Sequence, residues 1–513
     1  MPYQHWFVSR QKRQLTSILE ALIAFSDVCV GKVWDTSLQL VFEDALGSRQ
    51  ITVHGGLRAR KENMGGGGTR TLFKQMKDLG LVFYEDTNRK CRLTLIGEEL
   101  VKGKVSFVEA MRLQLQRYQY PSAAVWSGSG SVDHSFKVHP FQFLFRLLLD
   151  PRLDNTITME EMAGIVIHKA RTDANDCFDD VVARIIAYRA GDKSDLVTDT
   201  QGKDPKTFLN IANTFFNYID LTQFVERGFG TLHIRKGREQ EARKFAGDNP
   251  KFIPNPDLTE NYQRKFGRGR AAKDLRNFDD SKSPSQKELN EERIRKEYVL
   301  TALTTPITGI TPDIVQRIAM NTGISDKTVE HYLVQTYPHG NIDDFFVSYK
   351  ELAHMGTSGA TEFEKATCEM FRKIFHMKAR HVGSIGNTPD VFVESEDENF
   401  CGIIDNKAYK NGYSISGDHQ RVMEDVYIPT YRLYGDTQFP LAFFTYIAGS
   451  FGKNINDQLQ NIKRPAGVNC SAMPVDILIN LAQDYAAKGY DHNDLRAIFS
   501  VNREVQLADL KAT

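Results

Sequence analysis

Three side chains suited to acid–base or metal chemistry lie close together in the segment "PDVFVESEDENFCGIIDNKAY", residues 389–409. Asp390 follows a proline, and Asp405 lies two residues before Lys407. Side chains alternate between the two faces of a strand, so Asp405 and Lys407 are predicted to share one face. With "SEDEN" (residues 395–399) as the turn of a hairpin, Asp390 comes near the end of the strand that carries Asp405.

Two carboxylates at one point repel each other and raise each other's pKa unless a cation lies between them. A hard divalent cation takes oxygen ligands and removes this conflict, so Mg²⁺ is the predicted ion at Asp390 and Asp405. Lys407 can then orient or deprotonate a water beside the metal, which gives a nucleophile for a phosphodiester. The alternative is a surface hairpin with an ordinary salt bridge, because so short a pattern often arises by chance.

The segment before this hairpin adds a third acidic group. Residues 361–375, "TEFEKATCEMFRKIF", are predicted to form a helix whose buried stripe follows helical spacing: Phe363, Ala366, Met370, Phe371 and Ile374. At one hundred degrees per residue, Glu364 falls on the edge of this stripe, whereas Glu369 falls on the opposite side. Glu364 is therefore predicted to point inward at the site, and a partly solvated glutamate on the helix flank is the alternative.

Composition sets the frame for these elements. The chain has 513 residues with 65 basic and 65 acidic side chains, so several domains are expected and a uniformly basic coat is excluded. Six scattered cysteines have no C-x-x-C pair and no matching histidine spacing, which supports neither a zinc site nor a disulfide framework. The N-terminus lacks the apolar core of a signal peptide, and no apolar run approaches the length of a membrane span. We expect a bacterial-type cytoplasmic protein that does not interact with membranes.

The N-terminal part contains two segments with the pattern of a winged helix. In residues 69–103, apolar residues at helical spacing end at Gly80, and "LVFYE" and "CRLTLI" are predicted strands around the turn "DTNRK". Residues 207–237 repeat the pattern, with a helix, the turn "ERGFG" and the strand "TLHIRKG". Upstream of them, "TITMEEMAGIVIH" has the threonine-x-x-glutamate start of a capped helix.

Basic residues among glycines are candidates for nucleic-acid contact. The stretch "GGLRARKENMGGGGTR" contains Arg58, Arg60, Lys61 and Arg70, and glycine lets a backbone approach a phosphate closely. The sharpest basic cluster is "NYQRKFGRGRAAKDLR", residues 261–276, where the aromatic residues Tyr262 and Phe266 lie between basic side chains that include Arg264, Lys265, Arg268 and Arg270. Glycine and aromatic interleaving favours phosphate contact over a merely solvated surface.

At the level of motifs, a helix followed by "TPDVFV" and "GIIDNKAYKNGYSI" resembles the PD-(D/E)xK nuclease core, and in detail the cleavage domain of FokI-type Type IIS restriction endonucleases. The resemblance covers most of residues 345–505, and Asp390, Asp405, Lys407 and Glu364 fall in register with its core. Upstream, "LQLQRYQYPS" and "VHPFQFLFRLLLD" resemble the recognition half of AlwI-type endonucleases and their nicking relatives. Those nicking relatives carry a different residue type at the position of Lys407.

The resemblance implies a multidomain α+β DNA-binding part with winged-helix-like units, followed by an α/β PD-(D/E)xK nuclease core. The predicted domains are residues 1–150 and 151–285 for recognition, 286–344 as a helical linker, and 345–513 for cleavage. Within the linker, residues 310–333 have helix-turn-helix spacing around Gly323, and we interpret them as a helical connector.

In function, the resemblance implies Mg²⁺-dependent cleavage of double-stranded DNA at a fixed distance from a short asymmetric site. It also implies a transient homodimer for double-strand cleavage, with residues 417–429 where the dimer helices of that family begin. The alternatives are a site-specific nicking or repair endonuclease, and a non-catalytic winged-helix regulator. Metal-dependent plasmid cleavage would distinguish the enzymes from the regulator. Cutting at one fixed distance from one sequence would distinguish a Type IIS enzyme from a nicking or repair endonuclease.

Overall fold

In the computed structural model of the protein, the described residues are 4–9, 15–49, 67–126, 133–197, 206–227, 230–248, 250–255, 258–278, 285–383, 388–409, 412–435 and 437–511. The chain forms two compact units, Met1–Val299 and Leu300–Thr513. Helix α15 (Gln286–Thr304) spans the boundary between them. No helix in the described ranges is long and apolar enough to cross a membrane.

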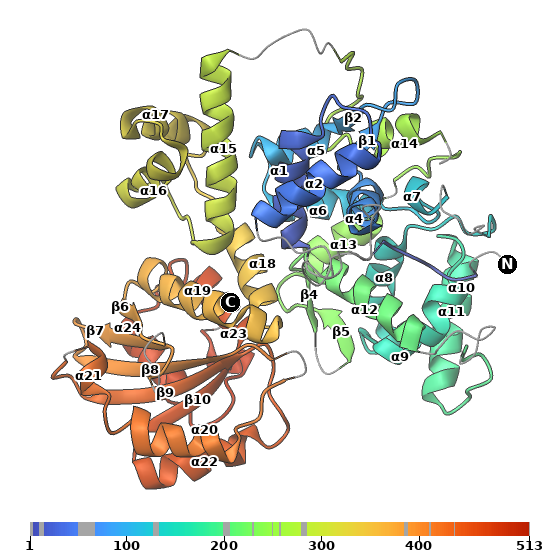
Figure 1. The fold of residues 1–513 in the computed structure, drawn as a ribbon. Coiled ribbons are helices and arrows are strands. Elements are labelled where there is room, and N and C mark those ends of the chain that lie inside the picture. Colours follow the sequence, from blue (N-terminus) through green and yellow to red (C-terminus); the bar gives the residue numbers. More distant parts are fainter. Residues whose placement is uncertain are drawn as a thin grey trace. The chain divides into compact units, whose positions relative to one another are not determined.

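The first unit begins with three helices and a hairpin. Helices α1 (Thr16–Val28), α2 (Thr36–Ser48) and α4 (Gly67–Asp78) precede the antiparallel strands β1 (Val82–Tyr84) and β2 (Cys91–Leu93), as Figure 1 shows in blue. In the segment between α1 and α2, Val30 bridges to Cys91 of β2, and Val33 bridges to Lys90 just before that strand. Gly80 has a φ of +71°, a left-handed conformation that favours glycine, and it follows α4 as predicted. The second predicted strand was too long, because Thr94 caps a new helix that begins at Leu95.

Short helices connect this region to a second sheet. They are α5 (Leu95–Val101), α6 (Phe107–Arg117), α7 (Ala123–Trp126), α8 (Pro140–Leu148) and the 3₁₀ turn η1 (Pro151–Leu153). Helix α8 is almost wholly buried, which agrees with the dense apolar sequence that forms it.

The second sheet of this unit has three antiparallel strands in the order β3-β5-β4, namely β3 (Thr156–Thr158), β4 (Val225–Arg227) and β5 (Thr231–Ile234). Between β3 and β4 lie α9 (Met159–Glu161), the π-helical turn η2 (Met162–Val166), α10 (Ile167–Lys169), α11 (Asn175–Arg189) and α12 (Lys206–Asp220). The predicted capping box is confirmed, since the side chains of Thr158 and Glu161 each accept a backbone N–H of the other residue. Helices α13 (Glu239–Gly247) and α14 (Thr259–Phe266) complete the unit.

The predicted boundary at residue 150 runs through the packed interior of this unit. Trp6 Nε1 donates a hydrogen bond of 2.7 Å to the carbonyl of Ala170, and Gln75 Nε2 donates one of 2.6 Å to the hydroxyl of Tyr218. The two recognition segments therefore share hydrogen bonds within one unit, and the four-part division stays a prediction.

The second unit contains a five-stranded mixed sheet in the order β10-β9-β8-β7-β6. Its strands are β6 (Lys378–His381), β7 (Val391–Ser395), β8 (Phe400–Lys407), β9 (Leu441–Ala448) and β10 (Asn469–Pro474). Strands β6, β7 and β8 pair antiparallel, whereas β8, β9 and β10 pair parallel. Strand β8 is buried along nearly its whole length, as expected for a central strand that is covered on both faces.

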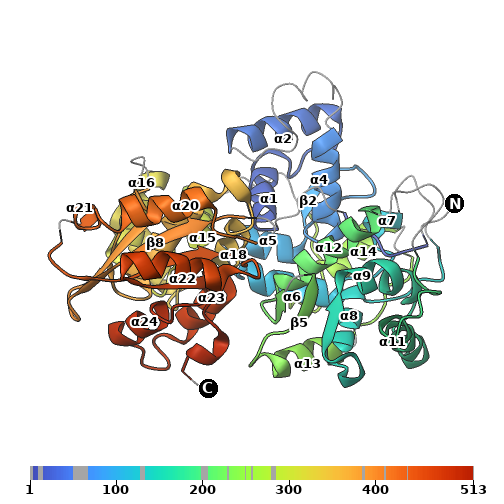
Figure 2. The same cartoon turned by 90° about the horizontal axis from the view of Figure 1, so that it is seen from below.

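Helices cover both faces of this sheet (Figures 1 and 2, yellow to red). One core is formed with α18 (Asp343–Leu352), α19 (Ala360–Lys373), α23 (Val475–Asp484) and α24 (His492–Phe499). The other contains residues of the π-helical turn η4 (Met423–Tyr427) and of α22 (Ile455–Ala466), and α20 (Gly417–Val422) and α21 (Arg432–Gly435) flank that turn in sequence. The short turns η3 (Gly356–Ser358) and η5 (Leu507–Asp509) belong to the same unit.

The predicted helical pair around Gly323 is present as α16 (Pro312–Thr322) and α17 (Asp326–Thr336). Gly323 has a φ of +70°, so it ends α16 in the left-handed conformation. The role of this pair as a connector stays a prediction.

Candidate active site

Strands β7 and β8 form the predicted hairpin, with residues 396–399 as its turn. Their register pairs Val391 with Ile404, so Asp390 lies beside the end of β8 that carries Asp405 and Lys407. The backbone N–H of Asn406 donates a hydrogen bond of 2.5 Å to Asp390 Oδ2, which fixes that carboxylate against β8. The hairpin therefore places both aspartates at one edge of the sheet, namely the edge formed by the C-terminal end of β8 and the N-terminal end of β7.

Asp405 and Lys407 point to the same face, as the two-residue period predicts. The ammonium group of Lys407 lies 2.9 Å from Oδ1 and 2.8 Å from Oδ2 of Asp405. The side chain of Asp405 is only 6 % exposed and that of Lys407 15 % exposed. This pair is therefore not the solvated surface salt bridge that was the alternative interpretation of the sequence.

The electrostatics of the site reflect carboxylates brought together under partial burial. Burial, and then the negative charges of Asp405 and Glu364, raise the pKa of Asp390 well above its ordinary value, against the opposing charge of Lys407. Burial alone lowers the pKa of Lys407, but the carboxylates of Asp405 and Asp390 outweigh it and raise that pKa. The site therefore holds an excess of negative charge that Lys407 only partly balances.

Glu364 reaches the same site from helix α19. Its Oε2 lies 2.8 Å from Nε2 of His381 on β6. A Cβ atom on Gly383 would lie 3.1 Å from Glu364 Oε2 and 3.2 Å from Asp390 Oδ1, so the two carboxylates approach one point from either side of this glycine. By contrast, Glu369 pairs with Arg372 at 3.0 Å near the helix surface. The structure thus brings Glu364 rather than Glu369 to the aspartates.

Aromatic side chains that the sequence did not single out line this edge of the sheet. Tyr446 is the register partner of Asp405 on β9, and its buried hydroxyl has no hydrogen-bond partner among the described residues. Tyr413 lies with its ring centroid 5.9 Å from the ammonium of Lys407, and its hydroxyl forms a hydrogen bond of 2.8 Å with His419 Nδ1. Burial, and then the charge of Asp405, raise the pKa of the Tyr413 hydroxyl. Only pairing between strands could have revealed these residues, and one sequence does not give it.

The site offers oxygen ligands of the kind that a hard cation prefers, but only two carboxylates are predicted to bind it. Asp390 and Asp405 supply carboxylate oxygens, and the mutual repulsion of the two groups is the conflict that a divalent cation relieves. Within the described part of the chain, no group of three or more His, Cys, Asp and Glu side chains is arranged to hold a metal. Mg²⁺ commonly binds through one or two carboxylates together with waters and substrate phosphates, so two aspartates suffice.

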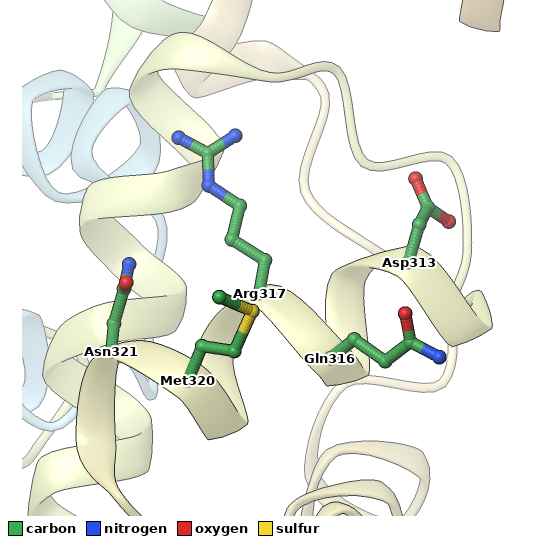
Figure 3. A pocket seen from close by; sticks show the side chains of 5 residues that line it. All are labelled: Asp313, Gln316, Arg317, Met320 and Asn321. Carbon is green, nitrogen blue, oxygen red and sulfur yellow. The ribbon is translucent and has the colours of Figure 1, made fainter.

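A separate surface pocket lies on helix α16 and is lined by Asp313, Gln316, Arg317, Met320 and Asn321 (Figure 3). Two of these side chains already have partners. Arg317 donates a hydrogen bond of 2.7 Å to Thr305, and Asp313 forms an ion pair with Lys373 of α19. The pocket contains none of the carboxylates described above, so it is not the catalytic candidate.

The predicted DNA-binding residues have different fates. Arg58, Arg60 and Lys61 lie outside the described residues, and Arg70 is exposed on α4. In the cluster at 261–276, Tyr262 and Phe266 are buried, so the aromatic residues that favoured phosphate contact in the sequence are core residues. A local pattern could not show this, because the two rings pack into the core of the unit.

The basic side chains of that cluster are mostly held by protein groups. Arg264 lies 2.8 Å from Glu260 and 3.4 Å from Asp274, and Arg270 forms an ion pair with Glu109. Arg268 donates a hydrogen bond of 3.0 Å to the carbonyl of Ala272, and Lys265 is exposed. A phosphate-binding role for these four side chains stays a prediction.

Comparison with known proteins identifies both parts of the chain. Residues 323–506 match the family model of the FokI cleavage domain, and residues 106–246 match that of the N-terminal domain of the Type II restriction endonuclease HgaI. The Type II restriction enzyme StsI of Streptococcus sanguinis is 25 % identical over 147 residues, which are 26 % of this chain and 24 % of StsI.

Two solved structures are also similar. The structure of the restriction endonuclease FokI covers 96 % of this chain and 98 % of its own, at 12 % identity and a TM-score of 0.31. The BpuJ1 endonuclease binding domain, solved in complex with modified DNA, covers 52 % of this chain and 94 % of its own, at 16 % identity and a TM-score of 0.35.

The comparisons therefore support the class of restriction endonucleases that the motifs predict. More particularly, a segment of the second unit is similar to the FokI cleavage domain, and a segment of the first unit is similar to the N-terminal domain of HgaI. The matched segment spans about a quarter of the length of StsI. The predicted likeness of the N-terminal half to AlwI-type enzymes stays a prediction.

Proposed function

We propose that the chain is a Type IIS restriction endonuclease that binds a short asymmetric duplex sequence and hydrolyses phosphodiester bonds at a fixed distance from it. The observation that carries this proposal is the convergence of Asp390, Asp405, Glu364 and Lys407 at one edge of the sheet. Family likeness to the FokI cleavage domain supports the same function.

In the proposed chemistry, Asp390 and Asp405 would hold Mg²⁺, which would supply Lewis-acid stabilisation of the phosphate and make a nearby water more acidic. Lys407 positions the attacking water, because its ammonium is fixed by both oxygens of Asp405 and faces the same edge. Glu364 is the third acidic group, oriented by its hydrogen bond with His381. The hydrogen bond from Asn406 N–H keeps Asp390 in place while the DNA is bound.

DNA recognition is assigned to the first unit. The order of α1, the paired segment 30–33, α2, α4 and the β1–β2 hairpin suits a winged helix, and the exposed Arg70 on α4 suits phosphate contact. Double-strand cleavage is proposed to need a second copy of the chain. Helix α20, within residues 417–429, has no buried residue among those described, which leaves its surface available for such a contact.

The decisive experiment is plasmid cleavage by the full-length protein with Mg²⁺ and with a chelator, followed by sequencing of the cut ends. We expect metal-dependent cuts at one distance from one sequence, and loss of cutting in Asp405→Asn. Asp397→Asn is the matched control, because Asp397 lies in the turn of the same hairpin and is 87 % exposed. Undiminished cutting by Asp405→Asn would contradict the site, and cuts at scattered positions would contradict the Type IIS mode.

A further inference from the structure

The structure points to helix α12 as a base-reading element that presents amide N–H donors, an inference that rests on the proposed function. We infer that Asn213 and Asn217 contact acceptor groups on the major-groove edge, which guanine, thymine and adenine offer and cytosine does not. The partner is duplex DNA, and the specificity comes from neutral amides rather than from the basic clusters that the sequence emphasised.

Helix α12 has one buried face and one polar stripe. Its buried residues include Phe208, Ile211, Ala212, Phe215, Phe216, Tyr218 and Ile219. Asn210, Asn213 and Asn217 are partly exposed and follow the spacing i, i+3 and i+7, so they lie along one side of the helix. Helix α12 is followed by β4 and β5, the antiparallel strands beside which it lies in Figure 1. In several classes of DNA-binding motif, one helix of a small unit enters the major groove and its polar side chains contact base edges.

Arg227 on β4 fixes the orientation of two of these amides. Its guanidinium donates a hydrogen bond of 2.9 Å to Asn213 Oδ1 and a second one to Asn217 Oδ1. Arginine has only donors, so each asparagine must turn its oxygen toward Arg227. The assignment of oxygen and nitrogen in both amides therefore follows from chemistry.

The consequence is that the NH₂ groups remain as the outward-facing part of the amides. Among the described residues, neither Asn213 Nδ2 nor Asn217 Nδ2 has a hydrogen-bond partner, and both side chains are partly exposed. On the major-groove edge, guanine offers the acceptors N7 and O6, thymine offers O4 and adenine offers N7, whereas cytosine offers only a donor. Oriented N–H donors therefore disfavour cytosine as the base that they contact.

Substitution of Asn213 distinguishes a base-reading role from a purely structural one, because only a base-reading side chain changes which base is preferred. In Asn213→Asp, a carboxylate oxygen still accepts from Arg227, but the outward group changes from a donor to an acceptor. The preferred base should then shift toward cytosine, or toward adenine contacted through its amino group, because guanine and thymine offer no donor on this edge. Asn213→Ala removes the contact without reversing it, and should relax the preference at that position by roughly 10- to 100-fold.

The chain offers a matched control in Asn175 at the start of α11. Arg146 donates a hydrogen bond of 3.0 Å to Asn175 Oδ1, so the same pair of residue types occurs outside the polar stripe of α12. Asn175→Asp changes the same atoms and the same net charge. It should leave the base preference unchanged and lower the affinity for all sequences by a similar small factor.

The experiment is selection from a random duplex library with the full-length protein in the presence of a chelator, with sequencing of the bound DNA. Cleavage by the wild-type protein with Mg²⁺ provides an independent record of the site, so a wild type that neither binds nor cuts one sequence refutes the proposed function. With a wild-type site in hand, a shifted preference at one base pair in Asn213→Asp supports the inference. An unchanged preference, or a uniform loss equal to that of Asn175→Asp, overturns it. If Asn213→Asp does not fold, Asn217→Asp is the second variant, with the same expected shift at a neighbouring base pair.

Discussion

Replacing Lys407 by alanine separates two roles that the same ammonium group could have. As a charge, Lys407 balances Asp405 and Asp390; as a positioning group, it holds the attacking water in place. The side chains of the Lys407–Asp405 pair are 15 % and 6 % exposed. Breaking a fully buried pair costs about 3–5 kcal/mol, and an exposed pair is worth about 0–1 kcal/mol. For this nearly buried pair we expect Lys407→Ala to lower the free energy of unfolding by about 2–3 kcal/mol in the absence of metal.

Mg²⁺ should reverse the loss of stability but not the loss of activity. A divalent cation at Asp390 and Asp405 supplies the missing positive charge, and at 100 times its Kd it adds about 2.7 kcal/mol to stability. It does not place a proton-accepting or water-orienting group where Lys407 was. Because such groups contribute roughly 10²–10⁴-fold, the cleavage rate of Lys407→Ala at saturating Mg²⁺ should stay lower by that factor.

The assay compares thermal unfolding with a chelator and with Mg²⁺, together with single-turnover cleavage over a range of metal concentration and pH. Lys365→Ala is the matched control, because Lys365 forms an exposed ion pair with Glu362 on α19 and should change neither quantity. Full recovery of the cleavage rate by added metal or higher pH would refute the positioning role and leave Lys407 as a charge-balancing residue. Unchanged stability without metal would refute the electrostatic argument.

Four further outcomes follow from the same geometry. Asp390→Ala should abolish cleavage while DNA binding in a gel-shift assay stays the same or strengthens, because a charge that repels phosphate is lost. Arg264→Ala should lower the melting temperature by a few degrees, since Glu260 loses its cation and Asp274 keeps only Arg276, and should leave base preference in a selection assay unchanged. Burial, and then His5, lower the pKa of His168 from 6.5 to about 4, so the free energy of unfolding should rise by about 2–3 kcal/mol from pH 4 to pH 6.5, a rise absent in His168→Phe. Gly383→Ala should slow cleavage up to about tenfold by displacing two carboxylates, whereas Gly309→Ala, which meets nothing within 4 Å, should not.

The hairpin of the candidate site was predictable from the sequence because strand alternation and turn position are determined locally. Strand alternation places Asp405 and Lys407 on one face, and a turn at 396–399 brings Asp390 beside them; both features are present. Helical spacing likewise distinguished Glu364 from Glu369, because the buried stripe of α19 leaves only one of them at its inner border. In both cases the repeat of a strand or a helix determines which way a side chain points.

Tertiary neighbours were not predictable from one sequence. The sequence predicted a surface-exposed basic cluster at 261–276, but Tyr262 and Phe266 are core residues and Arg264 lies 5.1 Å from the ring of Phe278. The spacing of residues along the sequence does not predict contacts with residues outside the same helix or strand. The same limit applies to Tyr446, which reaches Asp405 only because β9 pairs with β8 in parallel.

The arrangement of the sheet explains why acidic groups can be assembled here at all. Antiparallel pairing of β7 and β8 brings Asp390 to Asp405, and burial together with this proximity disfavours the charged form and raises the pKa of Asp390. Lys407 and the N–H of Asn406 offset part of that cost. The remaining negative charge opposes the approach of DNA phosphates, and a cation held as proposed would neutralise it. In the proposed function, cleavage would therefore be coupled to metal binding by electrostatics, and the affinity for DNA would have to come from the first unit, to which recognition is assigned as a proposal.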